Sequence, residues 1–385
     1  MGRLAPTPLA ARAVLTASRR QSSPELSRGS AAPQAGTRFP DVERLVTVAN
    51  GTTLCIDEFP GRGDGPLVVQ LEGHMAQHIA TPESFCRKLA ERGMRVVRVD
   101  NRDVGRSQRF PGVEYTLADL AEDVHGLIDV LGGPAIVCGR SMGGAVAQLL
   151  ALTHPQDLLG LGLFFTFAKS TDWPPPHPAT PAPFADEAGF VAWQRASLPG
   201  IAGPAHPFDD AYLDWISRAA WGRGVDWAGF ERQRKAMAAT RAWADRLAAV
   251  SLPVAIVHGA DDPIVPVDAA YRLAQLLPHA TVHIVAGLGH QQPPALDDLF
   301  VEATLRLARP AFRKGCAPRR VARGARGPSP RVSRRAALRH RRRARPPDRE
   351  APRRPGPTGR AGSSPAPRVA VPARGIPHRH GECCW

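Results

Sequence analysis

The sequence predicts an α/β fold in which helices cover both faces of a mostly parallel sheet and a helical cap is inserted. Between about residues 39 and 310, short apolar runs of strand length alternate with stretches of helical periodicity. Such alternation is typical of parallel strands joined by helical crossovers. From about residue 165 to 250 the alternation stops, and six of the seven tryptophans fall there. An insertion of this length between two strands predicts the cap.

The strands are predicted from their apolar runs and from one turn. Arg44–Ala49 and Thr53–Glu58 flank the dipeptide Asn50-Gly51, which favours the tight turn of a β-hairpin. This pair is therefore expected at an antiparallel edge of the sheet. The other predicted strands are apolar on both faces, as parallel strands are; they are Leu67–Leu71, Arg95–Val99, Ala135–Cys138, Leu158–Phe164, Val254–His258 and Thr281–Val285.

The crossover helices are predicted from amphipathic spacing. In Leu117–Leu131 the apolar residues recur every three or four positions and so form one helix face. Similar spacing predicts helices over Pro82–Arg92 and Asp297–Ala308, and an apolar run behind a Gly-rich turn predicts one over Gly144–Thr153.

The cap is predicted to be turn-rich in its first part, near Trp173, and helical in its second. The expected helices are Asp209–Ala220 and Trp227–Leu247. The aromatic side chains of this region either pack the cap against the sheet or line a pocket for an apolar substrate; the tryptophans concerned are Trp173, Trp193, Trp215, Trp221, Trp227 and Trp243.

The two ends of the chain differ from its middle in composition. Residues 1–38, rich in Ala, Ser, Pro and Arg, are expected to be a disordered extension, with an organelle transit peptide as the alternative. Residues 311–385 carry a net charge of +18, whereas residues 1–310 carry −3. This Arg/Pro-rich tail is expected to be disordered. It is interpreted as a frameshift product, the alternative being an arm that binds nucleic acid.

The part of the chain from 39 to 310 is therefore expected to bind neither nucleic acid nor a membrane. No run approaches the roughly 20 apolar residues of a membrane span. The six cysteines show no C-x-x-C pairing and are expected to be unpaired thiols in a reducing compartment, which predicts a cytoplasmic protein. The sequence does not predict an oligomeric state.

The segment Gly139-Arg140-Ser141-Met142-Gly143 matches G-x-S-x-G between a predicted buried strand and a predicted helix. In this strand–turn–helix context the motif indicates a nucleophilic serine on a sharp turn. Gly139 and Gly143 are expected to be glycines because a Cβ two residues from Ser141 would collide in that turn. The neighbouring thiol of Cys138 is expected to belong to the strand core.

A nucleophilic serine needs a base, and the base needs an orienting carboxylate. His290 follows the last predicted strand in the loop Gly287-Leu288-Gly289-His290. Asp261 and Asp262 follow the strand before it, and both are candidates for the acid. These loops lie at the carboxyl ends of parallel strands, where such sheets place their sites.

Residues from about 40 to 310 resemble the α/β-hydrolase superfamily, in which the triad occurs in the order Ser…Asp…His. The family pattern places the acid directly before Pro263 and three residues after Gly259, which favours Asp262 over Asp261. Within the superfamily, the loop Asp100–Ser107, Met142 and the segment Phe208-Asp209-Asp210 resemble the aclacinomycin methylesterase group. That group cleaves a methyl ester from an anthracycline.

The resemblance implies an oxyanion hole formed by the backbone N–H groups of His74 and Met142. The usual His-Gly of that loop is replaced here by Glu72-Gly73, so the hydrogen bonding of the loop is in question. The side chain of His74 either faces the pocket or packs the loop. In the loop 100–107, Arg102, Asp103 and Ser107 are expected to be structural braces.

These observations predict hydrolysis of a small-molecule ester through an acyl-enzyme on Ser141, with His290 as base and Asp262 as acid. The chemistry needs no metal and no organic cofactor, and a mechanism with an Asp nucleophile is excluded by Ser141. The alternatives keep the triad and change the reaction to carbon–carbon hydrolysis, perhydrolysis or acyl transfer, because Ser-Met-Gly-Gly elbows also occur in carbon–carbon hydrolases. Nucleic-acid binding through the tail is the alternative from another class.

Overall fold

The computed structural model describes residues 43–61, 65–171 and 178–313, with side chains up to residue 308. Several sequence-based expectations lie outside these residues. They concern the extension 1–38, the tail from residue 314 onward, Trp173, and the cysteines Cys316, Cys383 and Cys384.

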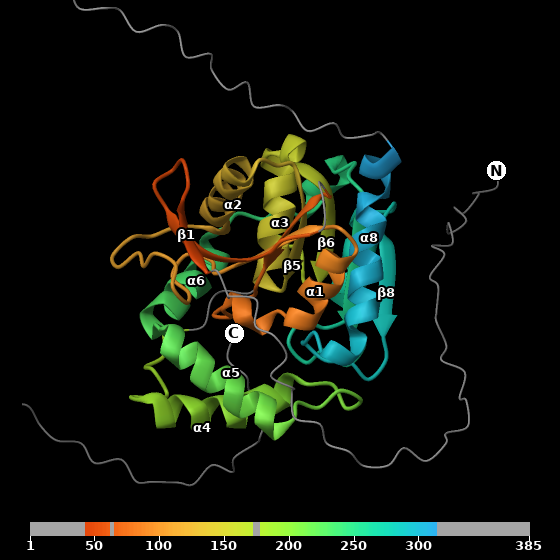
Figure 1. Cartoon of the computed structure of the whole chain (residues 1–385). Coiled ribbons are helices and arrows are strands. Elements are labelled where there is room, and N and C mark those ends of the chain that lie inside the picture. The colour runs from red at the N-terminus through yellow and green to blue at the C-terminus, as the bar shows by residue number, and fades with distance from the viewer. Residues whose placement is uncertain (1–42, 62–64, 172–177, 314–385) are drawn as a thin grey trace, which may run out of the picture. The chain divides into compact units, whose positions relative to one another are not determined.

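The described residues contain an eight-stranded sheet with the order β1-β2-β4-β3-β5-β6-β7-β8 (Figure 1). The hairpin strands β1 and β2 pair antiparallel, β2 is antiparallel to β4, and all other neighbours are parallel. The predicted α/β fold with an antiparallel edge is therefore confirmed. The strands are β1 (Arg44–Thr47), β2 (Thr53–Phe59), β3 (Leu67–Leu71), β4 (Arg95–Val99), β5 (Ala135–Arg140), β6 (Leu158–Phe164), β7 (Val254–Gly259) and β8 (Thr281–Val285).

Helices cover both faces of the sheet, as predicted. On one face, α2 (Leu117–Leu131), α3 (Met142–Thr153) and α7 (Asp268–Leu276) bury apolar side chains against strand residues such as Val69 and Val137. On the other face, α1 (Glu83–Glu91) and α8 (Asp297–Arg313) pack on Val68 and Ile136. Successive strand residues point to opposite faces, so each parallel strand is apolar throughout.

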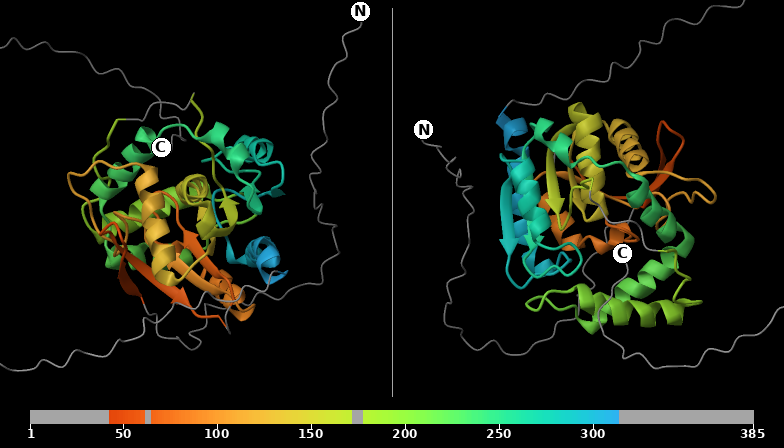
Figure 2. Two further views of the ribbon diagram at one scale, coloured as in Figure 1. Left: turned by 90° about the horizontal axis from the view of Figure 1, so that it is seen from above. Right: turned by 180° about the vertical axis from the view of Figure 1, so that it is seen from behind.

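The cap comprises α4 (Glu187–Ser197), α5 (Asp210–Arg223) and α6 (Trp227–Ala239), between β6 and β7. Figures 1 and 2 show α4 and α5 side by side, away from the helices that flank the sheet. Helix α4 is absent from the sequence-based prediction because a turn-rich segment precedes it. The start of α4 is nevertheless indicated in the sequence by Asp186, a favourable N-cap residue whose side chain accepts a hydrogen bond from the Gly189 N–H.

The helix predicted over Trp227–Leu247 is too long, because α6 ends at Ala239 and a short 3₁₀ segment, Ala244–Ala249, follows. The end is set by contacts with two distant residues, Lys169 and Leu117. The Lys169 ammonium donates to the carbonyl oxygens of residues 237 and 238 at 3.0 and 2.6 Å, and the Thr240 hydroxyl accepts from the N–H of Leu117. Cations at a helix C-terminus satisfy its free carbonyls.

Among the described residues, no helix is both long enough and apolar enough to cross a bilayer. The described thiols Cys55, Cys86 and Cys138 are buried and unpaired. Burial raises the pKa of Cys138, beside the elbow, to about 12, so at neutral pH this side chain is a neutral core residue.

Candidate active site

Ser141 lies at the turn between β5 and α3, on a strained backbone. Its φ is 49° and its ψ is −120°, a region that residues with a Cβ rarely adopt. The turn excludes side chains at both flanking glycines. A Cβ on Gly139 would lie 2.3 Å from the carbonyl oxygen of Gly143, and one on Gly143 would lie 2.7 Å from that of Leu71. The sharp turn expected from the motif is therefore present, and it places Ser141 at the carboxyl end of β5.

The backbone of Ser141 is fixed by the end of β6 and the residues after it. Its N–H donates to the carbonyl oxygen of Phe164 at 3.0 Å, and its carbonyl oxygen accepts from the Thr166 hydroxyl at 2.6 Å. Ser141 is buried, and its Oγ has no hydrogen-bond partner among the described residues. The structure thus locks the main chain of the serine while leaving its hydroxyl able to turn towards an acceptor.

Asp262 and His290 are brought together from the loops after β7 and β8. The Nδ1 of His290 donates to Asp262 Oδ2 at 2.7 Å. The other carboxylate oxygen, Oδ1, accepts from the N–H groups of Ile264 and Val265 at 2.8 and 2.9 Å. Since both oxygens of Asp262 are held by donors, the carboxylate has one fixed orientation towards the imidazole.

Asp261, the competing acid, points elsewhere. Its carboxylate accepts from the Gly287 N–H at 2.7 Å, and its own N–H donates to the carbonyl oxygen of Leu288. These bonds tie the loop after β7 to the loop after β8. The adjacent carboxylates therefore have different partners: Asp261 joins the two loops, and Asp262 contacts the histidine.

A second histidine also contacts Asp262. His258 is fully buried at the end of β7, and its Nε2 lies 3.4 Å from Asp262 Oδ2 while donating to the carbonyl oxygen of Val265 at 2.8 Å. Burial lowers the pKa of His258, which keeps its imidazole neutral. Sequence reasoning did not identify this residue, although the i, i+4 spacing to Asp262 is a local signal.

His290 is held by its backbone as well as by Asp262. Its N–H donates to the carbonyl oxygen of Ile201 at 2.8 Å, and its ring meets that of Phe165 edge-on at 5.9 Å between centroids. A Cβ on Gly289 would lie 2.3 Å from the Ile201 oxygen, which explains the glycine before the histidine. With Nδ1 donating its hydrogen bond to the Asp262 carboxylate, Nε2 is the ring atom that can accept a proton.

Ser141 and His290 lie on either side of the end of β6. The N–H of Ser141 bonds to Phe164, and the ring of the next residue, Phe165, contacts His290. The structure therefore joins Asp262 to His290 directly, and brings Ser141 to the same end of the sheet without a hydrogen bond to its Oγ from any described residue. Such bonds are often long before substrate binds.

The loop after β3 lies against Ser141. A Cβ on Gly73 would come 3.1 Å from the Cβ of Ser141. Met75 has a φ of 63°, and its N–H donates to Gln233 Oε1 on α6 at 3.0 Å. Met142 is the first residue of α3, where N–H groups have no acceptor within the helix. Both segments expected to supply oxyanion donors thus adjoin Ser141.

The His74 side chain packs the loop against the cap. Its Nε2 donates to the carbonyl oxygen of Phe230 on α6 at 2.9 Å, and the two rings stack with centroids 4.1 Å apart. Burial lowers the pKa of His74 to about 4, so the ring is neutral at pH 7. Of the two sequence-based alternatives, the packing role is the one that these contacts describe.

Glu72, the departure from the usual loop sequence, is fully buried and forms an ion pair with Arg140 of the elbow, with Oε2 3.2 Å from Nη1. The hydroxyl of Thr81 also donates to its carboxylate. The hydrogen bonding left open by the sequence is therefore supplied by the segment after β3 and by β5.

The loop 100–107 braces the structure, as expected from the sequence. Arg102 forms a two-bond ion pair with Asp123 of α2, at 2.6 and 2.7 Å. The carboxylate of Asp103 accepts two bonds from Arg232 of α6, at 2.7 and 2.9 Å. The Ser107 hydroxyl donates to a backbone oxygen within its own loop. These contacts join the loop to the sheet face and to the cap.

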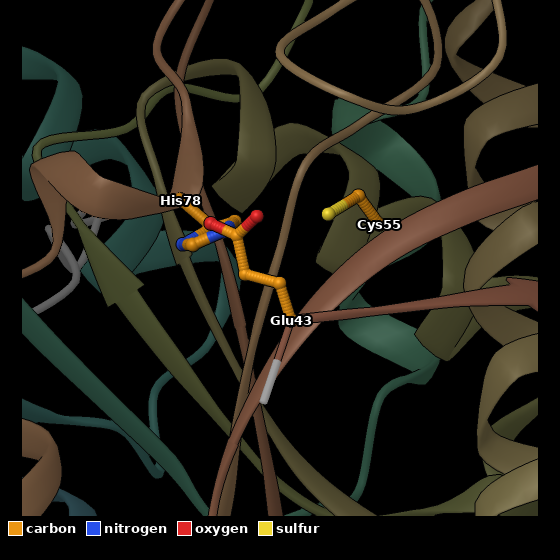
Figure 3. Close-up of side chains that lie close together, drawn as sticks. All are labelled: Glu43, Cys55 and His78. Atoms are coloured by element: carbon orange, nitrogen blue, oxygen red, sulfur yellow. The ribbon is translucent and has the colours of Figure 1, made fainter. Parts of the chain in front are cut away.

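Two groups of described side chains bring metal-ligand atom types together. One is Glu43, Cys55 and His78, shown in Figure 3, where the Glu43 carboxylate lies beside the His78 ring. The guanidinium groups of Arg223 and Arg106 already contact that carboxylate, so its charge is compensated by protein cations. The other group is His125, His154 and Asp157, in which the two imidazoles stack on each other.

Comparison of the sequence with known proteins shows the family to which the chain belongs. A family model described as serine aminopeptidase, S33, matches residues 66–188, and one described as alpha/beta hydrolase fold matches residues 203–292. The chain is 33% identical over 224 residues to a putative carbamate hydrolase, RutD, of Caulobacter vibrioides, an alignment covering 54% of this chain and 78% of that protein. The chain belongs to the α/β-hydrolase superfamily.

The chain also resembles methylesterases within this superfamily. It is 27% identical over 298 residues to rhodomycin D methylesterase DauP of Streptomyces sp. (strain C5), covering 68% of this chain and 96% of the relative. Among solved structures, a serine hydrolase involved in carbazole degradation, CarC, superposes with a TM-score of 0.55 at 22% identity, over 70% of this chain and 98% of that one. The expected resemblance to an anthracycline methylesterase group is confirmed by the first of these.

Proposed function

We propose that this α/β-hydrolase is a serine hydrolase that cleaves a carboxylic ester of a small apolar or aromatic substrate through an acyl-enzyme on Ser141. The proposal rests above all on the 2.7 Å hydrogen bond from His290 Nδ1 to Asp262, at the sheet end where Ser141 occupies a strained turn. A histidine fixed in this way presents Nε2 as a base, and a serine needs such a base to become a nucleophile.

In the proposed reaction, Ser141 Oγ attacks the ester carbonyl carbon while His290 Nε2 takes the hydroxyl proton. Asp262 stays ionised and stabilises the imidazolium. The carbon–oxygen bond to the alcohol then breaks, and His290 gives its proton to the departing oxygen. A water molecule, deprotonated by His290, attacks the acyl-enzyme, which releases the acid and restores Ser141. These steps use no metal and no organic cofactor.

The oxyanion of each tetrahedral intermediate is assigned to the N–H groups of His74 and Met142. Two observations support this assignment: Gly73 packs against Ser141, and α3 begins at Met142, whose N–H is in the first turn of the helix. A donor of this kind contributes about 3 kcal/mol to the stability of the transition state.

The aromatic side chains of the cap support an apolar or aromatic substrate. Trp227 stacks on Phe230 at 4.3 Å, and Phe230 stacks in turn on His74 of the oxyanion loop at 4.1 Å. Trp193 meets Trp227 edge-on at 5.9 Å. A continuous series of rings therefore runs from the cap to the loop beside the nucleophile, and the similarity to a methylesterase supports an ester as the reacting group.

The proposal is tested by labelling with a fluorophosphonate probe and by turnover of p-nitrophenyl esters of increasing acyl length. Wild type is expected to be labelled and to show turnover, and Ser141→Ala is expected to lose both while keeping its unfolding midpoint. Labelling or turnover that persists in Ser141→Ala contradicts the mechanism.

Product analysis separates ester hydrolysis from reactions that the same triad can perform. The panel contains a methyl ester, a carbamate, a diketone and a peroxide-supplemented ester. The methyl ester of an aromatic acid is expected to turn over fastest. A higher kcat/KM on the diketone would instead favour the carbon–carbon hydrolase alternative.

The alternative from another class, nucleic-acid binding through the Arg-rich tail, is tested by removing residues 314–385. The truncated chain is expected to keep full esterase activity, because every residue assigned to the site precedes the deletion. If DNA affinity and cellular function vanish with the tail while esterase activity has no cellular role, the proposed function is wrong. A cytoplasmic location remains part of the proposal and is supported by the three unpaired thiols.

A further inference from the structure

A buried pair of opposite charges lies between the elbow and the oxyanion loop. Strands β3 and β5 are parallel neighbours in which Leu71 pairs with Gly139, so the next residues along, Glu72 and Arg140, fall opposite each other. Glu72 is fully buried, and the Arg140 side chain is 14% exposed. Arg140 Nη1 lies 3.2 Å from Glu72 Oε2 and 3.4 Å from Oε1.

Both members of the pair are held by further bonds. The Thr81 hydroxyl donates to Glu72 Oε1, and Arg140 Nη1 donates to the carbonyl oxygen of Ala80 at 3.2 Å. The backbone oxygen of Glu72 accepts from Asn101 Nδ2 at 3.0 Å. The pair is therefore part of a connected network.

Both charged residues are close in the chain to the residues of the proposed reaction. Glu72 is two residues before the proposed donor His74, and Arg140 directly precedes Ser141. A Cβ on Gly143 would lie 2.7 Å from the Glu72 carbonyl oxygen, so the loop and the elbow are in contact. An oxyanion forms here during the proposed reaction, and a second negative charge in a low-dielectric site would oppose it.

The other titratable groups facing Glu72 do not supply a positive charge at neutral pH. Burial raises the pKa of Tyr212 on α5 and raises that of Cys86 on α1 to about 12. Burial lowers the pKa of His78. All three side chains are neutral near pH 7, so they cannot compensate the carboxylate. Arg98 donates to the Thr81 carbonyl oxygen, but its own charge is paired with Asp57.

We propose that Arg140 is a positioning residue whose positive charge neutralises Glu72. The N–H donor of the loop after β3 can then stabilise the oxyanion without an uncompensated negative charge nearby. This inference rests on the proposed function. The glutamate stands where the usual loop sequence has a histidine, and it fixes the loop through its contacts with Thr81 and Arg140. The arginine makes that carboxylate compatible with an anionic intermediate.

The test compares Arg140→Met, Glu72→Gln and the double variant, with kcat and KM measured on one p-nitrophenyl ester from pH 5.5 to 9. Arg140→Met is expected to lower kcat at pH 9 by at least tenfold with KM changed less than threefold. The decrease of kcat in Arg140→Met relative to wild type should be smaller at pH 5.5, because protonation of Glu72 removes the uncompensated negative charge. In the double variant the carboxylate is absent, so kcat at pH 9 is expected to recover at least fivefold over Arg140→Met.

Two further variants keep the test decisive. Arg140→Lys retains the charge and is expected to stay within threefold of wild type. Arg102→Met breaks a buried ion pair with Asp123 of α2 that includes neither Glu72 nor Arg140, and it is expected to lower the unfolding midpoint while its kcat follows the wild-type pH profile. If Arg140→Met does not fold, the Lys variant and Glu72→Gln at pH 9 carry the comparison: Glu72→Gln is expected to keep kcat within threefold.

The inference is overturned if the double variant is no more active than Arg140→Met at any pH, or if the Arg140→Met profile runs parallel to that of wild type. If Arg140→Met does not fold, the inference is overturned when kcat of Arg140→Lys or of Glu72→Gln falls more than threefold below that of wild type. Failure of the proposed function gives a different result, since wild-type turnover and fluorophosphonate labelling would then not depend on Ser141. Labelling that depends on Ser141, combined with parallel pH profiles, leaves the serine mechanism intact and removes only the role of the charge pair.

Discussion

Helices α2 and α3 pack on the sheet through buried aliphatic side chains, whereas the cap helices add few apolar side chains to that packing, Ala236 and Met237 of α6, and contact the rest of the molecule through charged and polar groups as well. Among the described residues, α4 and α5 contribute no side chain to the two apolar clusters of the sheet. Arg223 of α5 pairs with Asp100 at the end of β4, and Arg232 of α6 pairs with Asp103. Directional contacts of this kind fix an orientation, while apolar contact mainly supplies stability.

The comparison has a consequence for the site. The proposed acid and base come from loops of the sheet, where Asp262 is held by backbone N–H groups of its own loop. The oxyanion loop is instead held by the cap, through Phe230 and Gln233 of α6. The orientation of Asp262 therefore depends on the sheet loops alone. The seating of the cap affects the loop after β3, and it also affects His290, whose N–H donates to Ile201 of the cap insertion.

The largest expected effect belongs to the sheet side. Asp262→Asn should lower kcat by about 10⁴-fold, because an amide leaves His290 without its carboxylate partner. Asp261→Asn is the matched control and is expected to change kcat less than tenfold, since its carboxylate bonds only to backbone. Both are measured with a p-nitrophenyl ester. Equal losses in the two variants would show that the assignment of the acid is wrong.

An intermediate effect is expected at the main contact between cap and sheet. Arg223→Met leaves Asp100 buried without its cation, which should cost about 3 kcal/mol of unfolding free energy, raise KM and expose the cap to limited proteolysis. The cost should be smaller at pH 5 than at pH 8, because burial raises the pKa of Asp100 and a protonated carboxyl needs no cation.

The control for this prediction is Arg218→Met, which breaks an exposed ion pair with Glu187 inside the cap. Exposed pairs contribute less than about 1 kcal/mol, so little change is expected. If urea unfolding gives the two arginine variants the same stability, the polar contact between cap and sheet does not have the strength inferred here.

The smallest effect at neutral pH is expected from His74, which changes the stability only as the pH falls. Its pKa is about 4 in the folded protein and about 6.5 in the unfolded chain, so the unfolded chain binds a proton first as the pH falls. The stability linked to His74 is therefore complete above pH 6.5 and is lost towards pH 4, by at most about 3 kcal/mol. In His74→Gln, urea unfolding should show a shallower decline over this range. The rest of the decline of unfolding free energy with falling pH comes from other histidines whose pKa values burial also lowers. They are His78, His258 and His283. Identical slopes in wild type and variant would contradict this prediction.

The sequence was sufficient for features encoded within short segments. Every parallel strand coincides with an apolar run, and the Gly139–Gly143 turn was recognisable because its glycines are required by local collisions. Ser141 and His290 are likewise predicted from motifs of a few residues, whereas the choice of Asp262 over Asp261 rests on the resemblance to the superfamily. These features depend on neighbours in the chain, which a single sequence displays directly.

Features that depend on distant neighbours could not be predicted. Helix α6 ends early because the Lys169 side chain, 68 and 69 residues away, bonds to its last carbonyls. The pairing of Glu72 with Arg140 follows from the register of β3 and β5, which no local pattern specifies. Trp243 was assigned to the cap by its position, yet it is buried and donates to Gln148 of α3.

The stack of His74 on Phe230 also bears on how such enzymes change substrate. A cap exchanged for that of a relative would alter the surface offered to the substrate and, at the same time, the support of an oxyanion donor. Substrate preference and turnover would then not vary independently. A chimera that keeps Phe230 and Gln233 should separate them, because the Phe230 ring and the Gln233 amide hold the loop beside Ser141 while the rest of the cap is free to differ.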